Sequence, residues 1–190
     1  MKKDLGVKPY LFPMPVLMIA TYNEDGTVDV MNMAWGGICN NNMVALNISE
    51  GHKTAANIRR CGAFTVSVAD IPHLEQADFF GIATANKMPD KFARSGLHAV
   101  KSTRVDAPVV EEFPVTLECK VAELQQDKAG FRVLGEIVNV LADEAVLDEK
   151  GRVAPEKLNA FLFDAFQSGY YAIGEKVGQA WQSGAVLMKK

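Results

Sequence analysis

The fold is decided by a stretch that begins Asn32-Met-Ala-Trp-Gly-Gly37, continues through the apolar run Met43-Val-Ala-Leu-Asn-Ile48 and ends Ser49-Glu-Gly-His-Lys-Thr54. The apolar run predicts a short buried strand, and the polar cluster at 40–42 in front of it predicts a turn. The last part predicts a turn that leads into a short helix over Lys53–Cys61. The stretch is therefore expected to be a loop, a central strand and a helix start.

Strands dominate the chain on either side of this stretch. The predicted strands are Val16–Tyr22, Thr27–Met33, Ala63–Ala69, Val115–Val121 and Phe131–Leu141, and the alternation in Val115–Val121 predicts a half-buried strand. The connections Asn23–Gly26 and Asp127–Gly130 have hairpin turn chemistry. Because the strands form antiparallel hairpins and do not alternate with helices, the sequence predicts a mainly β fold, a small β-barrel with appended helices.

Two further helices are predicted outside the barrel strands. The first follows Asp70 as its cap, with Pro72 in its first turn and Leu74, Ala77, Phe80 and Ile82 on its apolar face. The second covers Pro155–Phe166. Between them the periodicity fades over Thr84–Val110, apart from a helical turn at Asp90–Ser95. A loop of that length in a compact domain is usually functional, so we expect it to border a ligand.

Length and charge limit the classes of protein to which the chain can belong. Its 190 residues are expected to form a single domain, 1–190, with a sizeable core. A net charge of -3 predicts no general attraction to nucleic acid or to an anionic membrane surface. The N-terminal segment is broken by Pro9, Pro13 and Pro15, so no signal peptide or membrane anchor is expected there.

The cysteines point to a reducing compartment. Cys39, Cys61 and Cys119 lie far apart without a C-x-x-C pair, which argues against a disulfide framework and a zinc site. We expect a cytoplasmic protein in which the three side chains serve packing.

The predicted helix start at Lys53 carries groups that attract a phosphate. The amides of a helix N-terminus and the positive end of its dipole favour an anion; Lys53 adds a counter-charge, and Ser49 and Thr54 add hydroxyl donors. His52 lies in the same turn. The sequence does not match a Walker A loop. The alternative, an ordinary capping turn with a solvated lysine, is the commoner occurrence.

The residues Asn32–Trp35 offer main-chain donors and acceptors beside an aromatic ring, a surface along which a flat heterocycle can lie. The alternative for Trp35 is a core position at a strand end. Asn86, Lys87 and Asp90-Lys91 lie in the long loop, where they would reach phosphates of the ligand or of a nicotinamide nucleotide, or form a solvated surface. Tyr170 and Tyr171 would stack on a ring or cover the barrel.

The sequence resembles the flavin reductase-like, FMN-binding split-barrel proteins, and within them the flavoredoxins. The resemblance is carried by Pro15–Thr21, Asn32–Trp35, Ser49–Thr54 and Tyr171–Trp181, in the family's order over nearly the whole chain. It implies a six-stranded split barrel that forms a homodimer, with FMN near the subunit interface. It also implies a set of cofactor-binding residues: Asn32, Met33, Ala34 and Trp35 along the ring, Asn47, Ile48, Ser49, His52, Lys53 and Thr54 at the ribityl phosphate, and Asn86 and Lys87 as a further contact.

The expected function is that of an FMN-dependent oxidoreductase of the flavin reductase type. In this hypothesis FMN takes a hydride from NAD(P)H and passes electrons to free flavin or to another acceptor, and no acid-base constellation is needed. The first alternative is a flavoredoxin-like carrier that exchanges electrons with a redox protein without nicotinamide turnover. The second is a barrel that binds no flavin.

Overall fold

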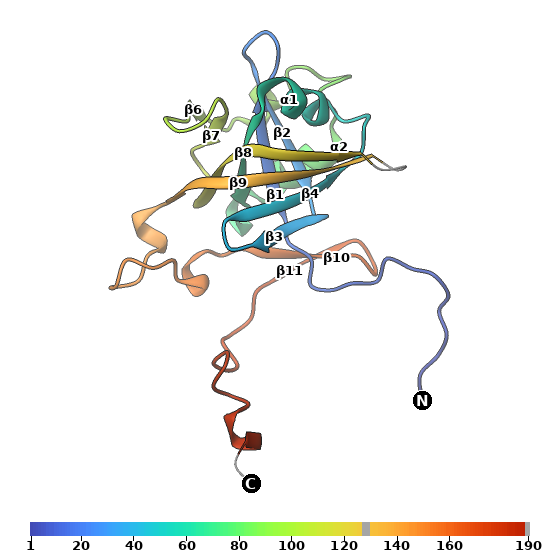
Figure 1. Cartoon of the computed structure of the whole chain (residues 1–190), viewed down its shortest axis with the longest axis vertical. Coiled ribbons are helices and arrows are strands. Elements are labelled where there is room, and N and C mark those ends of the chain that lie inside the picture. Colours follow the sequence, from blue (N-terminus) through green and yellow to red (C-terminus); the bar gives the residue numbers. More distant parts are fainter. Residues whose placement is uncertain (127–129, 189–190) are drawn as a thin grey trace.

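The computed structural model describes residues 1–126 and 130–188, and its centre is a curved antiparallel sheet (Figure 1). The sheet has seven strands in the order β2-β1-β5-β8-β9-β4-β3. Their bounds are β1 Leu17–Tyr22, β2 Val28–Met33, β3 Gly36–Asn40, β4 Met43–Ile48, β5 Ala63–Val68, β8 Val115–Gln126 and β9 Phe131–Ala142. All neighbouring pairs in it are antiparallel, so the mainly β prediction is confirmed. The resemblance implies a six-stranded barrel, whereas the main sheet of this structure has seven strands.

Two small sheets and three α-helices are appended to the main sheet. The small sheets pair β6 (Ala99–Lys101) with β7 (Pro108–Val110) and β10 (Phe161–Asp164) with β11 (Gly169–Ala172). The helices are α1 Lys53–Cys61, α2 Leu74–Ile82 and α3 Lys91–Ser95, and the 3-10 turns are η1 Ile71–His73, η2 Glu144–Val146, η3 Pro155–Lys157 and η4 Ala185–Met188. In the described part of the chain, no helix is long and apolar enough to cross a bilayer.

Helix α1 confirms the prediction made for its stretch of sequence. Its bounds are the predicted ones, and it ends because Gly62 adopts a left-handed conformation (φ 65°) and donates its N–H to Ile58 O. The turn into β4 is also confirmed. The predicted turn at Asp127–Gly130 falls largely on residues 127–129, which lie outside the described residues.

The main core lies between α1 and the sheet. It is formed by buried side chains from strands β1, β2, β4, β5, β8 and β9 together with α1, and these are Ile19, Met31, Met33, Val44, Leu46, Ile48, Ala55, Ile58, Phe64, Val66, Cys119, Phe131 and Val133. An ideal Cβ on Gly135 of β9 would lie 2.4 Å from Phe64 Cζ, so only glycine lets this ring fill the core. A second cluster packs α2 and β10 against the other face of β1 and β2.

The prediction that Val115–Val121 is half-buried is wrong for the first half of β8. Thr116 and Glu118, assigned to the polar face, are buried. The segment around β6 and β7 covers that face, and its Ser102 Oγ donates to the Glu118 carboxylate. The same carboxylate accepts a hydrogen bond from Asn139 Nδ2 of the neighbouring strand β9. The segment predicted as a long loop over 84–110 is thus partly structured. It contains the expected helical turn as α3 and, in addition, the strands β6 and β7.

The predicted helix over Pro155–Phe166 is also wrong. A short 3-10 turn is followed by β10, which pairs with β11 on one edge and forms a bridge from Phe163 to Met14 on the other. Tertiary pairing with two segments distant in sequence therefore overrides a local helical pattern.

Smaller corrections concern single side chains. Asp70 precedes a 3-10 turn, and its carboxylate contacts the His73 ring at 2.6 Å, with no side-chain cap on a backbone N–H. Ile82, assigned to the apolar face of a helix, is exposed. Of the cysteines assigned to packing, Cys119 is buried but Cys39 is exposed.

The two ends of the chain form arms that extend away from the barrel (Figure 1). Residues 1–13 and 171–188 are exposed throughout. Both arms leave the barrel at the end where β10 and β11 lie, and the turn between β1 and β2 is at the opposite end.

Candidate functional site

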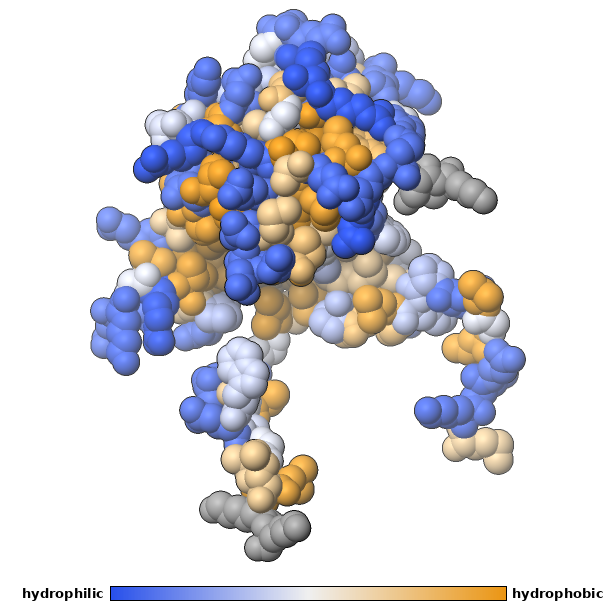
Figure 2. All heavy atoms as spheres, viewed as in Figure 1, coloured by the Kyte–Doolittle hydropathy of each residue, from blue (hydrophilic) through white to orange (hydrophobic). Residues whose placement is uncertain are grey.

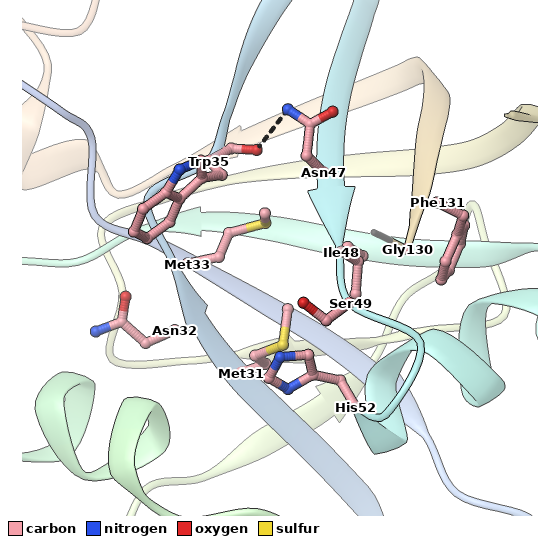
Figure 3. Close-up of a pocket in the computed structure, with 10 residues that line it drawn as sticks. All are labelled: Met31, Asn32, Met33, Trp35, Asn47, Ile48, Ser49, His52, Gly130 and Phe131. Carbon is pink, nitrogen blue, oxygen red and sulfur yellow. Dashed lines mark hydrogen bonds between the residues drawn. The ribbon is translucent and has the colours of Figure 1, made fainter. Parts of the chain in front are cut away.

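A cavity of about 450 Å³ opens between the ends of β2 and β4, the turn before α1 and the start of β9 (Figure 3). Its lining residues come from these elements and are Met31, Asn32, Met33, Trp35, Asn47, Ile48, Ser49, His52, Gly130 and Phe131. Four of them, Met31, Met33, Ile48 and Phe131, belong to the buried core. The base of this first cavity is therefore apolar and fixed by packing, while its edges are polar.

The ends of β2 and β4 are held together at the edge of the first cavity. Trp35 O accepts hydrogen bonds from the backbone N of Asn47 at 2.9 Å and from its Nδ2 at 3.2 Å, the latter drawn in Figure 3. Trp35 is 51% exposed, and its ring contacts Phe163 at 6.3 Å between centroids. Trp35 is thus not the core residue of the alternative prediction, whereas Ala34 beside it is buried.

A second cavity of about 250 Å³ adjoins the first. The two share Met31, Asn32 and His52, and the second is also lined by Lys53, Thr54, Phe80, Gly81, Ile82, Ala83, Thr84, Ala85 and Lys91. The structure brings the two candidate stretches, 32–35 and 49–54, to one place. The residues expected together at the phosphate are divided between the cavities, however, because Ser49 lines the first cavity and Lys53 lines the second.

The N-terminus of α1 has no side-chain cap. His52 occupies the cap position in an extended conformation (φ -77°, ψ 140°) without a side-chain hydrogen bond to the helix, and no acidic residue stands in the first turn. Uncapped amides at the positive end of a helix are a favourable environment for an anion, and the ammonium of Lys53 adds a full charge. The alternative of an ordinary capping turn is therefore less well supported.

The Thr54 side chain is hydrogen-bonded inside the protein. Its side chain is buried, and its hydroxyl donates to Asp29 Oδ2 at 2.7 Å. Since a hydroxyl has a single proton, the Thr54 side chain offers a ligand only acceptor capacity in this arrangement. The donor that Thr54 would offer a ligand is therefore its backbone N–H.

Asn86 and Lys87 lie at different distances from the cavities. Asn86 Nδ2 donates to Gly51 O at 2.7 Å, so the loop after α2 is tied to the turn before α1. The Lys87 side chain is exposed and lines neither cavity. Neither side chain lines a cavity, and only Asn86 contacts the turn that borders the site.

The two candidate tyrosines pack outside both cavities. Tyr170 donates its hydroxyl to Asp78 Oδ1 at 2.8 Å, and burial followed by this contact raises the pKa of Tyr170 to about 12. Tyr171 lies edge-on to Phe12, with 5.8 Å between ring centroids. Both tyrosines thus hold the β10–β11 hairpin in place.

The turn at 49–52 is stabilised by exposed side chains on its outer side. Arg59 of α1 pairs with Glu50 at 2.5 Å, lies 4.3 Å above the Phe131 ring, and donates to Gln126 at 3.0 Å. Hydrogen bonds from Arg59 and then from Gln126 lower the pKa of Glu50 to about 2. This network connects α1 to the start of β9, which forms one side of the first cavity.

Sequence reasoning missed three residues at the site. Gly130 and Phe131 of the first cavity lie just before and at the start of β9, far away in the sequence, and no local pattern could assign them. Asp29 forms a buried ion pair at 3.0 Å with Lys91, a loop residue that was expected either to reach a phosphate or to be solvated. The signal for the pair was a carboxylate in the middle of the otherwise mostly apolar strand β2, which requires a partner once the strand is covered.

Comparison with known proteins gives concordant findings. A family model described as "Flavin reductase like domain" matches residues 10–165. The structure is similar to flavoredoxin of Desulfovibrio vulgaris (Miyazaki F), with a TM-score of 0.92 and 33% identity over 97% of this chain and 100% of that one. An uncharacterized protein of Archaeoglobus fulgidus is 28% identical over 143 residues, which cover 74% of this chain and 79% of the relative.

Two more distant structures share the fold. The nitrilotriacetate monooxygenase component B of Bacillus cereus has a TM-score of 0.80 at 16% identity, over 94% of this chain and 100% of the other. An FMN-binding protein from Thermus thermophilus has a TM-score of 0.77 at 18% identity, over 94% and 98%. At these identities the likeness concerns the split-barrel architecture alone.

Proposed function

This chain belongs to the flavin reductase like domain family, and from that premise we propose that it is a single FMN-binding domain, 1–190, that transfers electrons through its flavin. The observation that carries the proposal is the pair of joined cavities, one with an apolar base and one at an uncapped helix N-terminus. An amphipathic ligand with a flat ring at one end and a phosphate at the other fits such a pair. FMN is that kind of molecule.

In the first cavity, the side chains of Met31, Met33, Ile48 and Phe131 would support one face of the ring system. The polar edges at Asn32, Asn47 and Ser49 would hydrogen-bond to its nitrogens and carbonyls, which tunes the electronics of a flavin. Ala34 and Trp35 would close the side next to β3. The base of the cavity is apolar because these side chains are packed in the core.

In the second cavity, the amides at the start of α1 would hold the phosphate, with Lys53 as counter-ion and His52 at the junction with the ring. Asn86 would keep the neighbouring loop closed over this end through its bond to Gly51 O. Lys87 would act only through a rearrangement of its exposed side chain, and is the weakest of the proposed ligands.

When bound, FMN would supply the redox chemistry, which in this proposal is hydride transfer from NAD(P)H and electron transfer to free flavin or another acceptor. The chain's own residues bind and orient it and keep water from one face. The first cavity is open at the half-exposed Trp35, which leaves room for a donor or acceptor to approach.

The second candidate function is a flavoredoxin-like electron carrier that serves a redox protein and does not turn over nicotinamide. It is supported by the 33% identity to a flavoredoxin over nearly the full length of both chains. The assay that separates the two is steady oxidation of NADH or NADPH with excess free flavin, which a carrier alone does not sustain.

The proposed functional unit is a homodimer. The exposed arms carry large apolar side chains without a partner in the described chain, among them Val7, Val177 and Trp181, each at least 100% exposed. Figure 2 shows apolar side chains along both arms. Burial of such side chains against a second copy would remove apolar surface from water, which is the main driving force for association.

The test of FMN binding begins with the absorbance spectrum of the protein mixed with FMN and freed of excess ligand. Lys53→Met is expected to raise the Kd for FMN by the equivalent of one charge-assisted hydrogen bond, about 1.5–3 kcal/mol or roughly ten- to hundredfold. Lys101→Met, which removes an exposed lysine that lines neither cavity, is the matched control. A wild-type protein that retains no flavin would refute the proposal, and an unchanged Kd in Lys53→Met would remove Lys53 from the site.

A further inference from the structure

A third cavity, of about 610 Å³, lies at the other end of α1 from the candidate flavin site. It is formed by the end of α1, the start of β5, the turn between β6 and β7, and the middle of β8. In Figure 1 the β6–β7 pair lies away from both arms of the chain. Among the residues that the structure describes, none lines both this third cavity and either of the other two.

Helix α1 separates the third cavity from the second. Lys53, the first residue of the helix, lines the second cavity, and Cys61, its last residue, lines the third. Eight residue steps of 1.5 Å place these two positions about 12 Å apart along the helix axis. A small molecule in the third cavity therefore does not compete for space with a flavin in the first two.

The third cavity is positively charged, although the whole chain has a net charge of -3. Its lining includes three cations, Lys101, Arg104 and Lys120, and among the described residues a single carboxylate, Asp106. Burial raises the pKa of the Cys61 thiol, so this lining residue stays neutral. Three positive charges and one negative charge leave an excess of two positive charges in a concave surface, where low-dielectric walls strengthen the local potential.

The carboxylates of the protein leave most of this charge unpaired. Of the three cations, only Lys101 has an ion pair with a described residue, to Asp106 at 3.7 Å, and both side chains are exposed. An exposed pair at that distance neutralises little. Glu118, two residues before Lys120 on β8, is buried, but its two oxygens accept hydrogen bonds from other residues of the protein and form no ion pair with a lining cation in the described part of the chain.

The turn that carries Arg104 is fixed before any ligand binds. Ser102 is buried, and its Oγ accepts hydrogen bonds from the backbone N–H groups of Arg104 and Val105 at 2.9 Å each while it donates to Glu118. Val105 also packs with Ala63 in a small buried cluster. Because this wall is already ordered, a ligand would not have to pay for the ordering of a loop.

We propose that the third cavity binds a small anion with two adjacent phosphate groups, either free pyrophosphate or a nucleoside diphosphate, while the flavin site is occupied. A monovalent anion would leave part of the positive charge unpaired, whereas a diphosphate supplies several negative charges and many acceptor oxygens. The guanidinium of Arg104 can bind a phosphate through two parallel hydrogen bonds, and the lysines act as point charges. The volume, about 610 Å³ against about 450 Å³ for the first cavity, leaves room for more than one phosphate group.

The test titrates pyrophosphate and ADP separately into the whole protein by calorimetry. FMN is present at a saturating concentration so that the flavin site is filled, and the salt concentration is held near about 0.15 M because exposed charges are screened. At least one of the two probes is expected to bind with a Kd of about 1 mM or lower. The tighter probe identifies the source of the diphosphate, and adenosine, which lacks phosphates, is expected not to bind.

Variants of exposed side chains assign the binding to the third cavity. In Arg104→Met/Lys120→Met the Kd for the tighter probe is expected to rise about tenfold or more, because charge-assisted contacts are lost. In Asp106→Asn it is expected to fall, because the lining loses its negative charge. Lys150→Met is the matched control, since it removes an exposed lysine that lines none of the three cavities, and its Kd should stay within about twofold.

The inference is overturned if neither probe shows saturable binding up to about 10 mM, if the double variant binds like wild type, or if Asp106→Asn binds more weakly. Lys53→Met separates this site from the proposed phosphate site of the flavin: it should leave the affinity for the probe unchanged, and a loss equal to that of the double variant would also overturn the inference. A wild-type protein that binds the probe through Arg104 and Lys120 but takes up no FMN would overturn the proposed function and support the third cavity as a separate site.

Discussion

Replacing Gly135 with alanine tests how rigid the base of the first cavity is. The new Cβ would lie 2.4 Å from Phe64 Cζ and 3.3 Å from Val44 Cγ1. Both side chains are buried in the core that also contains Met31, Met33 and other lining residues, so neither can move into solvent. The methyl group must therefore displace the ring or the strand.

The expected destabilisation follows from overpacking of a filled core, about 1–3 kcal/mol in the free energy of unfolding. The variant Phe64→Leu removes the ring atoms that the methyl group would strike, and alone it leaves a gap. In the double variant the methyl group occupies part of that gap. The two changes should therefore be less than additive, with a coupling energy of about 0.5–3 kcal/mol.

Urea unfolding followed by circular dichroism measures these free energies, at one fixed protein concentration because association would shift the midpoint. The control is Gly37→Ala in β3, where nothing lies within 4 Å of the added Cβ, and its effect should stay within about 0.5 kcal/mol. Wild-type stability in Gly135→Ala, or strictly additive changes in the double variant, would refute the description of a tightly packed base.

Three further predictions concern titratable groups. Because Arg59 lowers the folded-state pKa of Glu50 to about 2, the stabilisation is present above the unfolded value near 4.5 and is lost as pH falls toward 2; unfolding midpoints of wild type and Glu50→Gln should converge over that window. Burial raises the pKa of Cys119 to about 12, so a thiol reagent at pH 8 should label exposed Cys39 rapidly and leave Cys119 unlabelled, and Cys39→Ser should abolish the fast phase. Tyr170 should ionise only near pH 12, detected as a late step in an ultraviolet titration that Tyr170→Phe removes.

The parts of the fold that local pattern determines were predictable. Helix α1 has the predicted bounds because its apolar spacing and the glycine that ends it act within the segment itself. The β1–β2 hairpin has its turn where the sequence places it, since Gly26 adopts a φ of 83° that the turn requires. The turn before α1 was predictable for the same reason, and its binding of a phosphate stays a prediction.

The remaining features depend on contacts between distant segments. Phe161–Asp164 is a strand because Met14 and β11 supply its partners, which no local window contains. Glu118 was expected in a half-buried strand, and Lys91 was expected either to reach a phosphate or to be solvated. Both side chains are buried because loops that lack periodicity fold over this part of the sheet. Such burial is visible only once the chain is closed in three dimensions.

The direction in which the two arms leave the barrel has a practical consequence for handling the protein. An affinity tag or fluorescent reporter fused to either terminus would lie beyond the arms, on the side of the barrel where β10 and β11 lie. Phe163 of β10 contacts Trp35 at the edge of the first cavity, so this is also the side from which Trp35 is approached. The exposed turn between β1 and β2, at the other end of the molecule, is where a short label can be inserted with the least interference.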